Sequence, residues 1–158
     1  MCSIFGVIAL KKTDPEMILR WYTLLAINIQ QRGSEYHGIG HSNGKDLKVK
    51  KKAGLVSASL GDEKLMAEIM ADEPQMMLGQ TRFSTTGTST TVNAQPMYLK
   101  PREGVVALAT NGDTLNYGKW KAYLEKLHSK FISKNDAEAL LHYILIHSQD
   151  IPDRYRTG

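Results

Sequence analysis

The pattern of apolar and polar residues predicts several short strands. The opening run CSIFGVIAL, residues 2–10, is uncharged and rich in β-branched and aromatic side chains, so it predicts a buried strand. An Asn43-Gly44 dipeptide, a strong signal for a hairpin turn, separates the second and third predicted strands. The strands expected after the first cover Tyr36–Ser42, Asp46–Lys52, Gln75–Phe83 and Gly104–Thr110.

Apolar residues at helical spacing predict four helices. The first begins at Thr13-Asp14, which offer an N-cap before Pro15, and ends near Arg32-Gly33. The second opens at Gly61-Asp62, and the last begins at Asn135, with Glu138 three residues later in a capping-box arrangement. The apolar faces expected for the four helices are Ile18, Trp21, Tyr22, Leu25 and Ile29; Leu65, Met66, Ile69 and Met70; Trp120, Tyr123, Leu124 and Leu127; and Leu140, Leu141 and Ile144.

The order of these elements favours an α+β layered fold. Strands and helices do not alternate regularly enough for a doubly wound parallel sheet. The 158 residues are the size of one ordinary domain, and no repeat or Pro-rich linker divides them. We therefore expect residues 1–158 to form a single domain.

Composition excludes several classes of protein. Apolar residues make up 42% and charged residues 23%, as in ordinary globular proteins, and no stretch approaches the ~20 apolar residues of a membrane-spanning helix. A single cysteine, Cys2, excludes an internal disulfide and suits a reducing compartment, so we expect a cytoplasmic protein without membrane contact.

The positive charge has two possible meanings. The net charge is +4, and much of the excess lies in Lys48, Lys50, Lys51 and Lys52. This run reads more simply as a solvated face than as a nucleic-acid site, because no aromatic residues that could stack on bases are interleaved with it. Nucleic acid is thus not the expected partner, although a basic nucleic-acid-binding protein stays open as a third hypothesis.

The sequence predicts no cofactor and no metal. None of the strand-to-helix turns has the glycine spacing of a phosphate-binding loop. The single cysteine and the histidines do not form a cluster with the spacing of metal ligands.

Six segments, read in order, resemble one enzyme family. Alone, a cysteine near the start, an arginine or an Asn-Gly turn has an ordinary structural explanation. In order the segments are CSIFGV from Cys2, QRGSEYHGIG from Gln31, GQTRFSTTG from Gly79, NAQP from Asn93, ATNGDTLNY from Ala109 and NDAEALLHYI from Asn135. This succession is similar to the class II glutamine amidotransferases, the N-terminal nucleophile hydrolases, with their CGIFG, HRG, GHTRYSTTG, NAQP, HNGNLVN and SDSEVLLH runs. The resemblance is strongest to the glutaminase domain of amidophosphoribosyltransferase, and it implies a four-layer α-β-β-α sandwich.

Cys2 suits the chemistry that the resemblance implies. A thiol is intrinsically nucleophilic once deprotonated. A free α-amine has a pKa of about 7.7–8.0 and can relay protons near neutrality. An N-terminal cysteine, exposed by removal of Met1, supplies both groups in one residue. The expected reaction is attack of the Cys2 thiol on the glutamine carboxamide, which releases ammonia and, after a thioester intermediate, glutamate.

The resemblance also implies roles for other residues. Asn111 and Gly112 would form the oxyanion hole, with Cys2 as the catalytic nucleophile. Arg82 and Thr85 would bind the α-carboxylate of glutamine, and Asp136 would bind its α-ammonium group. Arg32 and Gly33 would support the site.

The sequence departs from the family pattern at several positions. Ser3 replaces a glycine, and Gln31, Gln80 and Thr110 replace histidines. The domain is expected to be a short version, truncated at its C-terminal side, with no synthase domain. Ammonia would then pass to an acceptor on a separate synthase or acceptor-binding subunit. The alternative is a catalytically inactive glutamine-binding or regulatory subunit with the same fold.

Overall fold

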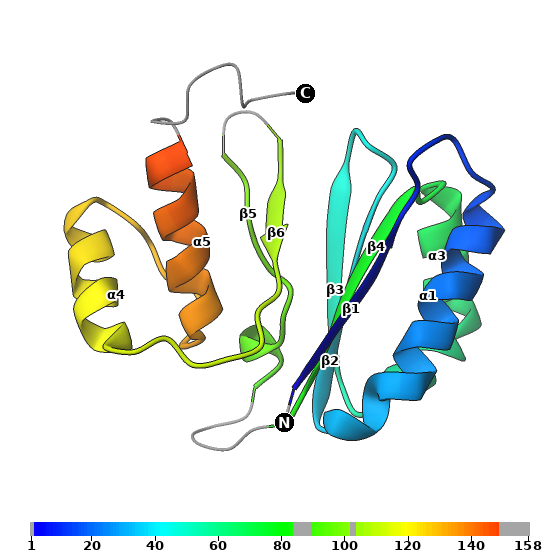
Figure 1. Ribbon diagram of the computed structural model, residues 1–158, viewed down its shortest axis with the longest axis horizontal. Coiled ribbons are helices and arrows are strands. Elements are labelled where there is room, and N and C mark those ends of the chain that lie inside the picture. The colour runs from blue at the N-terminus through cyan, green and yellow to red at the C-terminus, as the bar shows by residue number, and fades with distance from the viewer. Residues whose placement is uncertain (1, 84–89, 102–103, 149–158) are drawn as a thin grey trace.

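The computed structural model describes residues 2–83, 90–101 and 104–148 as a four-layer sandwich. Two antiparallel sheets lie face to face, and helices cover the outer side of each sheet (Figure 1). The α+β class and the α-β-β-α arrangement expected from the sequence are therefore confirmed. No helix in these ranges combines the length and the apolarity that crossing a membrane requires.

The first sheet contains four strands in the order β1-β4-β2-β3, with antiparallel neighbours. Its strands are β1 (Ser3–Ile8), β2 (Tyr36–Ser42), β3 (Leu47–Ala53) and β4 (Met76–Arg82). Its outer face is covered by α1 (Pro15–Ile29), α2 (Val56–Leu60) and α3 (Glu63–Ala71), with the short 3-10 helix η1 (Gln30–Arg32) after α1. Asp14 caps α1, because its side chain accepts a hydrogen bond from the Glu16 N–H at 3.0 Å.

The second half of the molecule is a smaller sheet with two helices. Its elements are the 3-10 helix η2 (Thr91–Asn93), β5 (Met97–Leu99), β6 (Val106–Leu108), α4 (Tyr117–Lys126) and α5 (Asp136–His147). Helix α5 packs on the strand pair through Ala137 and Leu141, which bury Met97. Figure 1 shows α4 outside α5, on the far side from the first sheet.

The buried stripe of α1 is narrower than the sequence predicts. Ile18, Tyr22 and Ala26 are buried against the first sheet, but Trp21 is 55% exposed and Leu25 is 44% exposed. A helix lying on a sheet buries residues four apart along one line, and residues one position off that line turn toward solvent. The prediction that Trp21 and Leu25 belong to the buried face was wrong.

The start of α5 also differs from its prediction. Its apolar face runs through Ala137 and Leu141, while Leu140 and Ile144, both expected inside, are 37% and 42% exposed. Asn135 caps the helix through the Ala137 N–H at 2.9 Å. The Glu138 carboxylate reaches past the cap, however, and accepts from the N–H groups of residues 132 and 133 and from the hydroxyl of residue 133. The capping box expected between Asn135 and Glu138 is therefore not formed.

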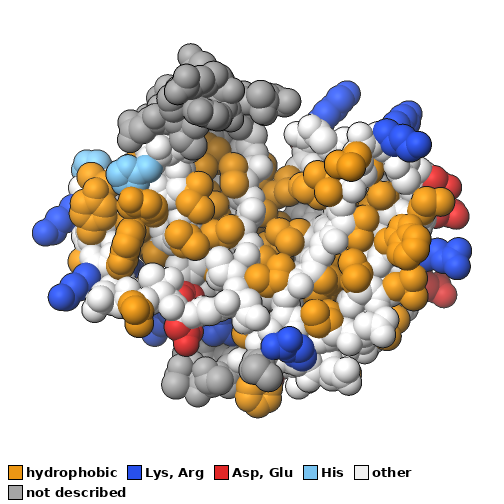
Figure 2. Space-filling model, in the orientation of Figure 1, with side chains coloured by type: hydrophobic (Ala, Val, Ile, Leu, Met, Phe, Trp, Pro, Cys, Tyr) orange, Lys and Arg blue, Asp and Glu red, His pale blue; other side chains and the backbone are white. Residues whose placement is uncertain are grey.

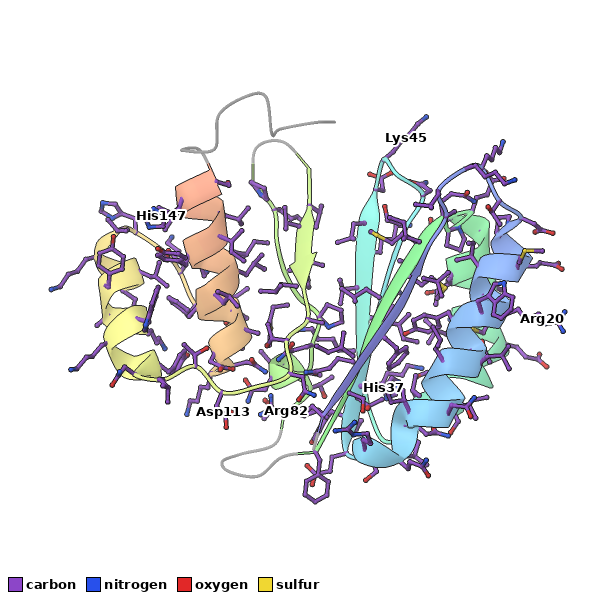
Figure 3. The ribbon with its side chains drawn as sticks, viewed as in Figure 1. Arg20, His37, Lys45, Arg82, Asp113 and His147 are labelled. Atoms are coloured by element: carbon purple, nitrogen blue, oxygen red, sulfur yellow. The ribbon has the colours of Figure 1, made fainter. Side chains whose placement is uncertain are left out.

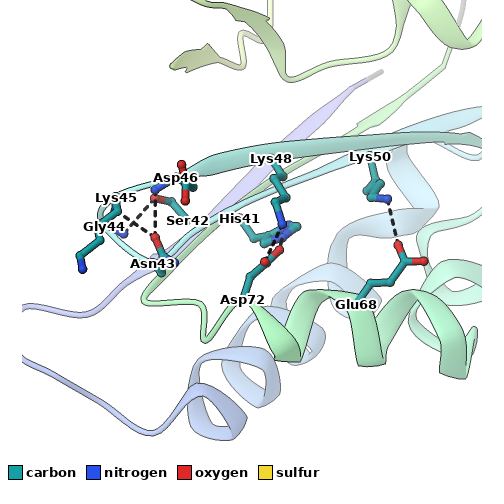
Figure 4. Close-up of polar contacts among 10 residues, drawn as sticks. All are labelled: His41, Ser42, Asn43, Gly44, Lys45, Asp46, Lys48, Lys50, Glu68 and Asp72. Atoms are coloured by element: carbon teal, nitrogen blue, oxygen red, sulfur yellow. Dashed lines mark hydrogen bonds and ion pairs between the residues drawn. The ribbon is translucent and has the colours of Figure 1, made fainter. Parts of the chain in front are cut away.

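The lysine run lies on β3 and is largely paired with α3. Lys48 contacts Asp72 at 2.5 Å, Lys50 contacts Glu68 at 2.9 Å and Lys52 contacts Asp62 at 2.7 Å. Figure 4 shows the first two of these ion pairs between the strand and the helix. Such exposed pairs contribute little stability, but they compensate the local positive charge that suggested a nucleic-acid surface.

Lys51 occupies the opposite face of β3 and points between the two sheets. Its Nζ donates to the carbonyl of Val92 at 3.3 Å and lies 3.5 Å from the sulfur of Met97. Burial lowers the pKa of Lys51 to about 8, and the nearby Glu138 carboxylate partly opposes this shift.

The two layers of sheet meet backbone to backbone at Gly38 of β2. A Cβ atom at this position would clash with the carbonyl oxygen of Gln95 and would lie only 2.8 Å from its carbonyl carbon and 3.1 Å from Cδ of Pro96. Only glycine permits this approach, which places the segment after η2 directly on the first sheet.

Candidate functional site

A cavity of about 260 Å³ is lined by residues from the N-terminus, the end of β4 and the start of α5. Figure 1 shows these three parts of the chain at the same end of the sandwich. Four of the site residues expected from the sequence line the cavity, namely Cys2, Arg82, Gly112 and Asp136. The other lining residues are Gln80, Phe83, Gln95, Thr110, Asp113, Thr114, Tyr117, Lys134 and Asn135. Its volume lies below the ~300–1,000 Å³ of pockets for drug-sized ligands, so it fits a small molecule such as an amino acid.

The strand pairing of β1 with β4 places Cys2 beside Arg82. Ser3 pairs with Thr81 in the antiparallel register, so the residues next to them along each strand meet at the end of the sheet. Cys2 is half-buried and is a free cysteine. Cys2, directly before β1, and Arg82, the last residue of β4, thus line the same end of the sheet.

Arg82 is held in place by its own hydrogen bond and by a close backbone contact. Its Nη1 donates to the carbonyl of Asn93 at 3.1 Å. Behind it, a Cβ atom on Gly33 would lie 2.5 Å from the carbonyl carbon of Thr81 and 2.6 Å from the Arg82 nitrogen. The chain at Gly33 therefore supports the end of β4, whereas Arg32 is an exposed residue of η1 and is not a lining residue.

Asp136 is the first residue of α5 and lines the cavity. Its Oδ2 accepts a hydrogen bond from the Thr114 N–H at 2.5 Å, which ties the helix start to the loop after Gly112. An acidic side chain in the first turn of a helix interacts favourably with the partial positive charge of the helix N-terminus.

Of the two residues expected to form the oxyanion hole, Gly112 lines the cavity, whereas Asn111 is not among the lining residues. Thr110 and Gly112 are lining residues, and Asn111, between them, is exposed. Gly112 has a φ of +156°, and a Cβ atom there would meet nothing within 4 Å. Glycine is therefore favoured by the backbone conformation rather than by lack of space. Thr85, the other residue expected at the carboxylate, lies outside the described residues.

Charges of both signs surround the cavity. Arg82 and Lys134 are cationic, while Asp113 and Asp136 are anionic. Figure 3 shows Arg82 and Asp113 near each other at this end of the molecule. Burial, with smaller contributions from the carboxylates of Glu138 and Asp136, raises the pKa of Tyr117, so this phenol stays neutral. Such an arrangement suits a zwitterionic ligand.

Two glutamines in the cavity wall were given no role by the sequence reasoning. Gln80 donates from Nε2 to the Thr110 carbonyl at 2.9 Å, and Gln95 accepts from the Thr110 N–H at 2.6 Å. Both lie in segments that carry the family resemblance, GQTR and NAQP, so the motifs held a signal. Gln80 and Thr110, two of the departures from the family pattern, are in direct contact.

The described part of the chain brings no group of three or more His, Cys, Asp or Glu side chains into a metal-binding arrangement. The buried side chain of His37 instead makes structural hydrogen bonds. Its Nδ1 lies 2.8 Å from the Gly54 carbonyl and its Nε2 lies 2.7 Å from the Ser59 hydroxyl.

Comparisons with known proteins found similar sequences and a similar solved structure. A family model described as a glutamine amidotransferase domain matches residues 61–156. The chain is 33% identical over 90% of its length to an amidophosphoribosyltransferase of Methanothermobacter thermautotrophicus, and 34% identical over 92% to that of Archaeoglobus fulgidus. The solved structure of the B. subtilis glutamine phosphoribosylpyrophosphate amidotransferase covers 92% of the chain with a TM-score of 0.70 and 27% identity. The chain spans only 29% and 32% of the two curated relatives and 29% of the solved chain.

Proposed function

Because this chain belongs to the glutamine amidotransferase domain family, we propose that it releases the side-chain nitrogen of glutamine, with Cys2 as the nucleophile. The observation that carries the proposal is the cavity itself. A free cysteine directly before the first strand, an arginine at the end of β4 and an aspartate at the start of α5 all line it. These three groups match the needs of one substrate, an amino acid with a reactive side-chain amide.

Arg82 and Asp136 would bind the two charged ends of the amino acid. A planar guanidinium forms bidentate hydrogen bonds with a carboxylate, and the Asn93 contact sets its orientation. Asp136, held by the Thr114 N–H, would accept hydrogen bonds from the α-ammonium group. With both ends fixed, the length of the side chain decides whether its carboxamide reaches the sulfur, which favours glutamine over asparagine.

The reaction would proceed in two steps. Once Met1 is removed, the α-amine of Cys2 accepts the thiol proton and the sulfur attacks the carboxamide carbon. The negative charge that develops on the amide oxygen is stabilised by the side-chain amide of Asn111 and the N–H of Gly112. The C–N bond then breaks, the nitrogen takes the proton from the α-amine, and ammonia leaves behind a thioester. Water attacks the thioester, glutamate is released and the thiol is restored.

The fate of the ammonia belongs to the same proposal. The relatives are amidophosphoribosyltransferases, and the chain spans less than a third of the length of the two described above. We therefore place the acceptor of the nitrogen outside these 158 residues.

The test uses the full chain, with intact mass measured first to establish whether Met1 is absent. Glutamate release from glutamine is measured for the wild type and for Cys2→Ala, with asparagine as the control substrate. We expect turnover of glutamine, little turnover of asparagine, and loss of activity in Cys2→Ala by at least ~10³-fold. A glutamine-like electrophile should add its mass to the wild type only.

Equal glutamate release by the wild type and Cys2→Ala would refute the proposal. Glutamine binding without turnover, measured by calorimetry on protein that lacks Met1, would instead support the inactive glutamine-binding subunit.

A further inference from the structure

Thr110 is held by two side chains rather than by a strand. Strand β6 ends at Leu108, two residues earlier. The Thr110 N–H donates to Oε1 of Gln95 at 2.6 Å, and the Thr110 carbonyl accepts from Nε2 of Gln80 at 2.9 Å. Both backbone polar groups of one residue are thus satisfied by amides from two other segments of the chain, directly before Asn111 and Gly112.

The two glutamines are themselves fixed. Gln80 is 1% exposed in the middle of the first sheet, where it pairs with Gly38 and Ile4 on the neighbouring strands. Gln95 is 4% exposed and lies against Gly38 at the backbone contact between the two layers. A buried amide has few alternative rotamers and few alternative partners, so the position of each amide is set by the sheet behind it.

Gln95 also connects the segment before Asn111 to the start of α5. Its Nε2 donates to Oδ1 of Asn135 at 3.2 Å, and the same oxygen caps the helix through the Ala137 N–H. Asn135 in turn donates from Nδ2 to the Asn93 carbonyl at 2.8 Å, the carbonyl that also receives Arg82. One chain of hydrogen bonds therefore joins the segments that carry Arg82, Gly112 and Asp136.

We propose that Gln95 and Gln80 are positioning residues that set the oxyanion donors of Asn111 and Gly112 against the Cys2 sulfur. This inference rests on the proposed function for its catalytic part. Neither glutamine touches the reacting atoms in this scheme. They act through Thr110, because they bind both its carbonyl and its N–H. The position of Thr110 then determines where Asn111 and Gly112 lie.

The expected kinetic signature follows from when the donors act. Charge on the amide oxygen develops only in the transition state, so misplaced donors lower kcat and leave ground-state binding nearly unchanged. A displacement of ~1 Å near a catalytic group can cost ~10²-fold in rate. We therefore expect kcat for glutamine to fall about 10- to 100-fold in Gln95→Met and in Gln80→Met, with KM within about threefold of the wild type.

A matched control lies at the other end of β4. Gln75 clamps Thr13 in the same way, accepting from its N–H at 2.9 Å and donating to its carbonyl at 2.7 Å. Gln75→Met removes the same kind of hydrogen-bond pair far from the cavity. It should therefore lower stability as the other two variants do, without lowering kcat. Its kcat should match that of the wild type.

Rescue by a conservative variant separates positioning from simple folding. Gln95→Glu keeps an oxygen acceptor for the Thr110 N–H but loses the donor to Asn135. We expect its kcat to lie between those of Gln95→Met and the wild type. Unchanged kcat in both Met variants, or a rise in KM that accounts for the whole loss, would overturn the proposal.

Amide hydrogen exchange tests the clamp without relying on activity. The Thr110 N–H should be protected in the wild type and in Gln75→Met, and should exchange at least ~10-fold faster in Gln95→Met. Equal protection of this amide in Gln95→Met and the wild type would refute the clamp. If the wild type releases no glutamate, the proposed function fails, and this exchange result still decides whether the two glutamines hold the segment.

Discussion

Replacing Gly38 by alanine tests the contact on which the geometry of the site depends. The added Cβ would lie 2.8 Å from the carbonyl carbon of Gln95, against the ~3.5–4.0 Å of an ordinary carbon–carbon contact. The obstacle is backbone, which cannot rotate away, so Gln95 must retreat by roughly 0.7–1.2 Å. Such overpacking costs about 1–3 kcal/mol.

Two measurable effects follow from this displacement. Each kcal/mol lowers Tm by about 2–4 °C in a domain of this size, so Tm should fall by about 2–12 °C. The 2.6 Å hydrogen bond from the Thr110 N–H to Gln95 would also stretch beyond bonding range. Because this bond fixes the segment before Asn111, glutamine turnover should fall up to ~10²-fold.

Gly40→Ala is the matched control, two residues further along the same strand and on the same face. Its Cβ would meet the Leu78 carbonyl oxygen at 3.5 Å and Cγ of Pro96 at 3.6 Å, which are ordinary contacts. Gly→Ala at a compatible position stabilises by about 0.4–1 kcal/mol, so this variant should be as stable as the wild type or slightly more so. Urea denaturation and glutamate release are measured for both variants. If they unfold at the same urea concentration and turn over glutamine equally, the backbone contact does not position the site.

Two further predictions concern buried charges. Since burial lowers the pKa of Lys51 from its ordinary 10.5 to about 8, the unfolded chain binds more protons than the native protein between these values. The free energy of unfolding of the wild type should therefore rise as pH increases from 8 to 10.5. Urea denaturation across this range should show a smaller rise for Lys51→Met. Identical pH slopes for the two proteins would contradict the burial of the amine. Glu138 is 4% exposed and accepts three hydrogen bonds from residues 132 and 133. Glu138→Gln should therefore lower the free energy of unfolding by about 1.5–3 kcal/mol, measured by urea denaturation. An unchanged midpoint would show that these bonds do not stabilise the protein.

Much of the fold could be predicted because several elements carry strong local signals. The Asn43-Gly44 dipeptide predicted the hairpin, and β2 has the predicted bounds, Tyr36–Ser42. Asp14 before Pro15, an N-cap residue followed by a proline in the first turn, predicted the start of α1. Short elements without a period were missed, namely α2, with five residues, and β5, with three. Their conformation is decided by packing against the rest of the chain, which periodicity does not report.

Part of the candidate site could also be predicted from the sequence, and part could not. Cys2, Arg82, Gly112 and Asp136 were expected together from the order of their segments, and they line one cavity. Their catalytic and binding roles stay predictions. The contacts of the glutamines with Thr110 could not be foreseen, because a side-chain amide reaching a backbone carbonyl thirty residues away leaves no pattern in the sequence.

The ion pairs that join β3 to α3 and its two ends favour one register of the hairpin. Side chains on a strand alternate between faces, so a slip of β3 by one residue would exchange its two faces. Three lysines would then enter the space between the sheets, where burial already lowers the pKa of Lys51. Their acidic partners Asp62, Glu68 and Asp72 would be left without ion pairs. Salt bridges that add little to the free energy of unfolding can thus still disfavour a misaligned β3.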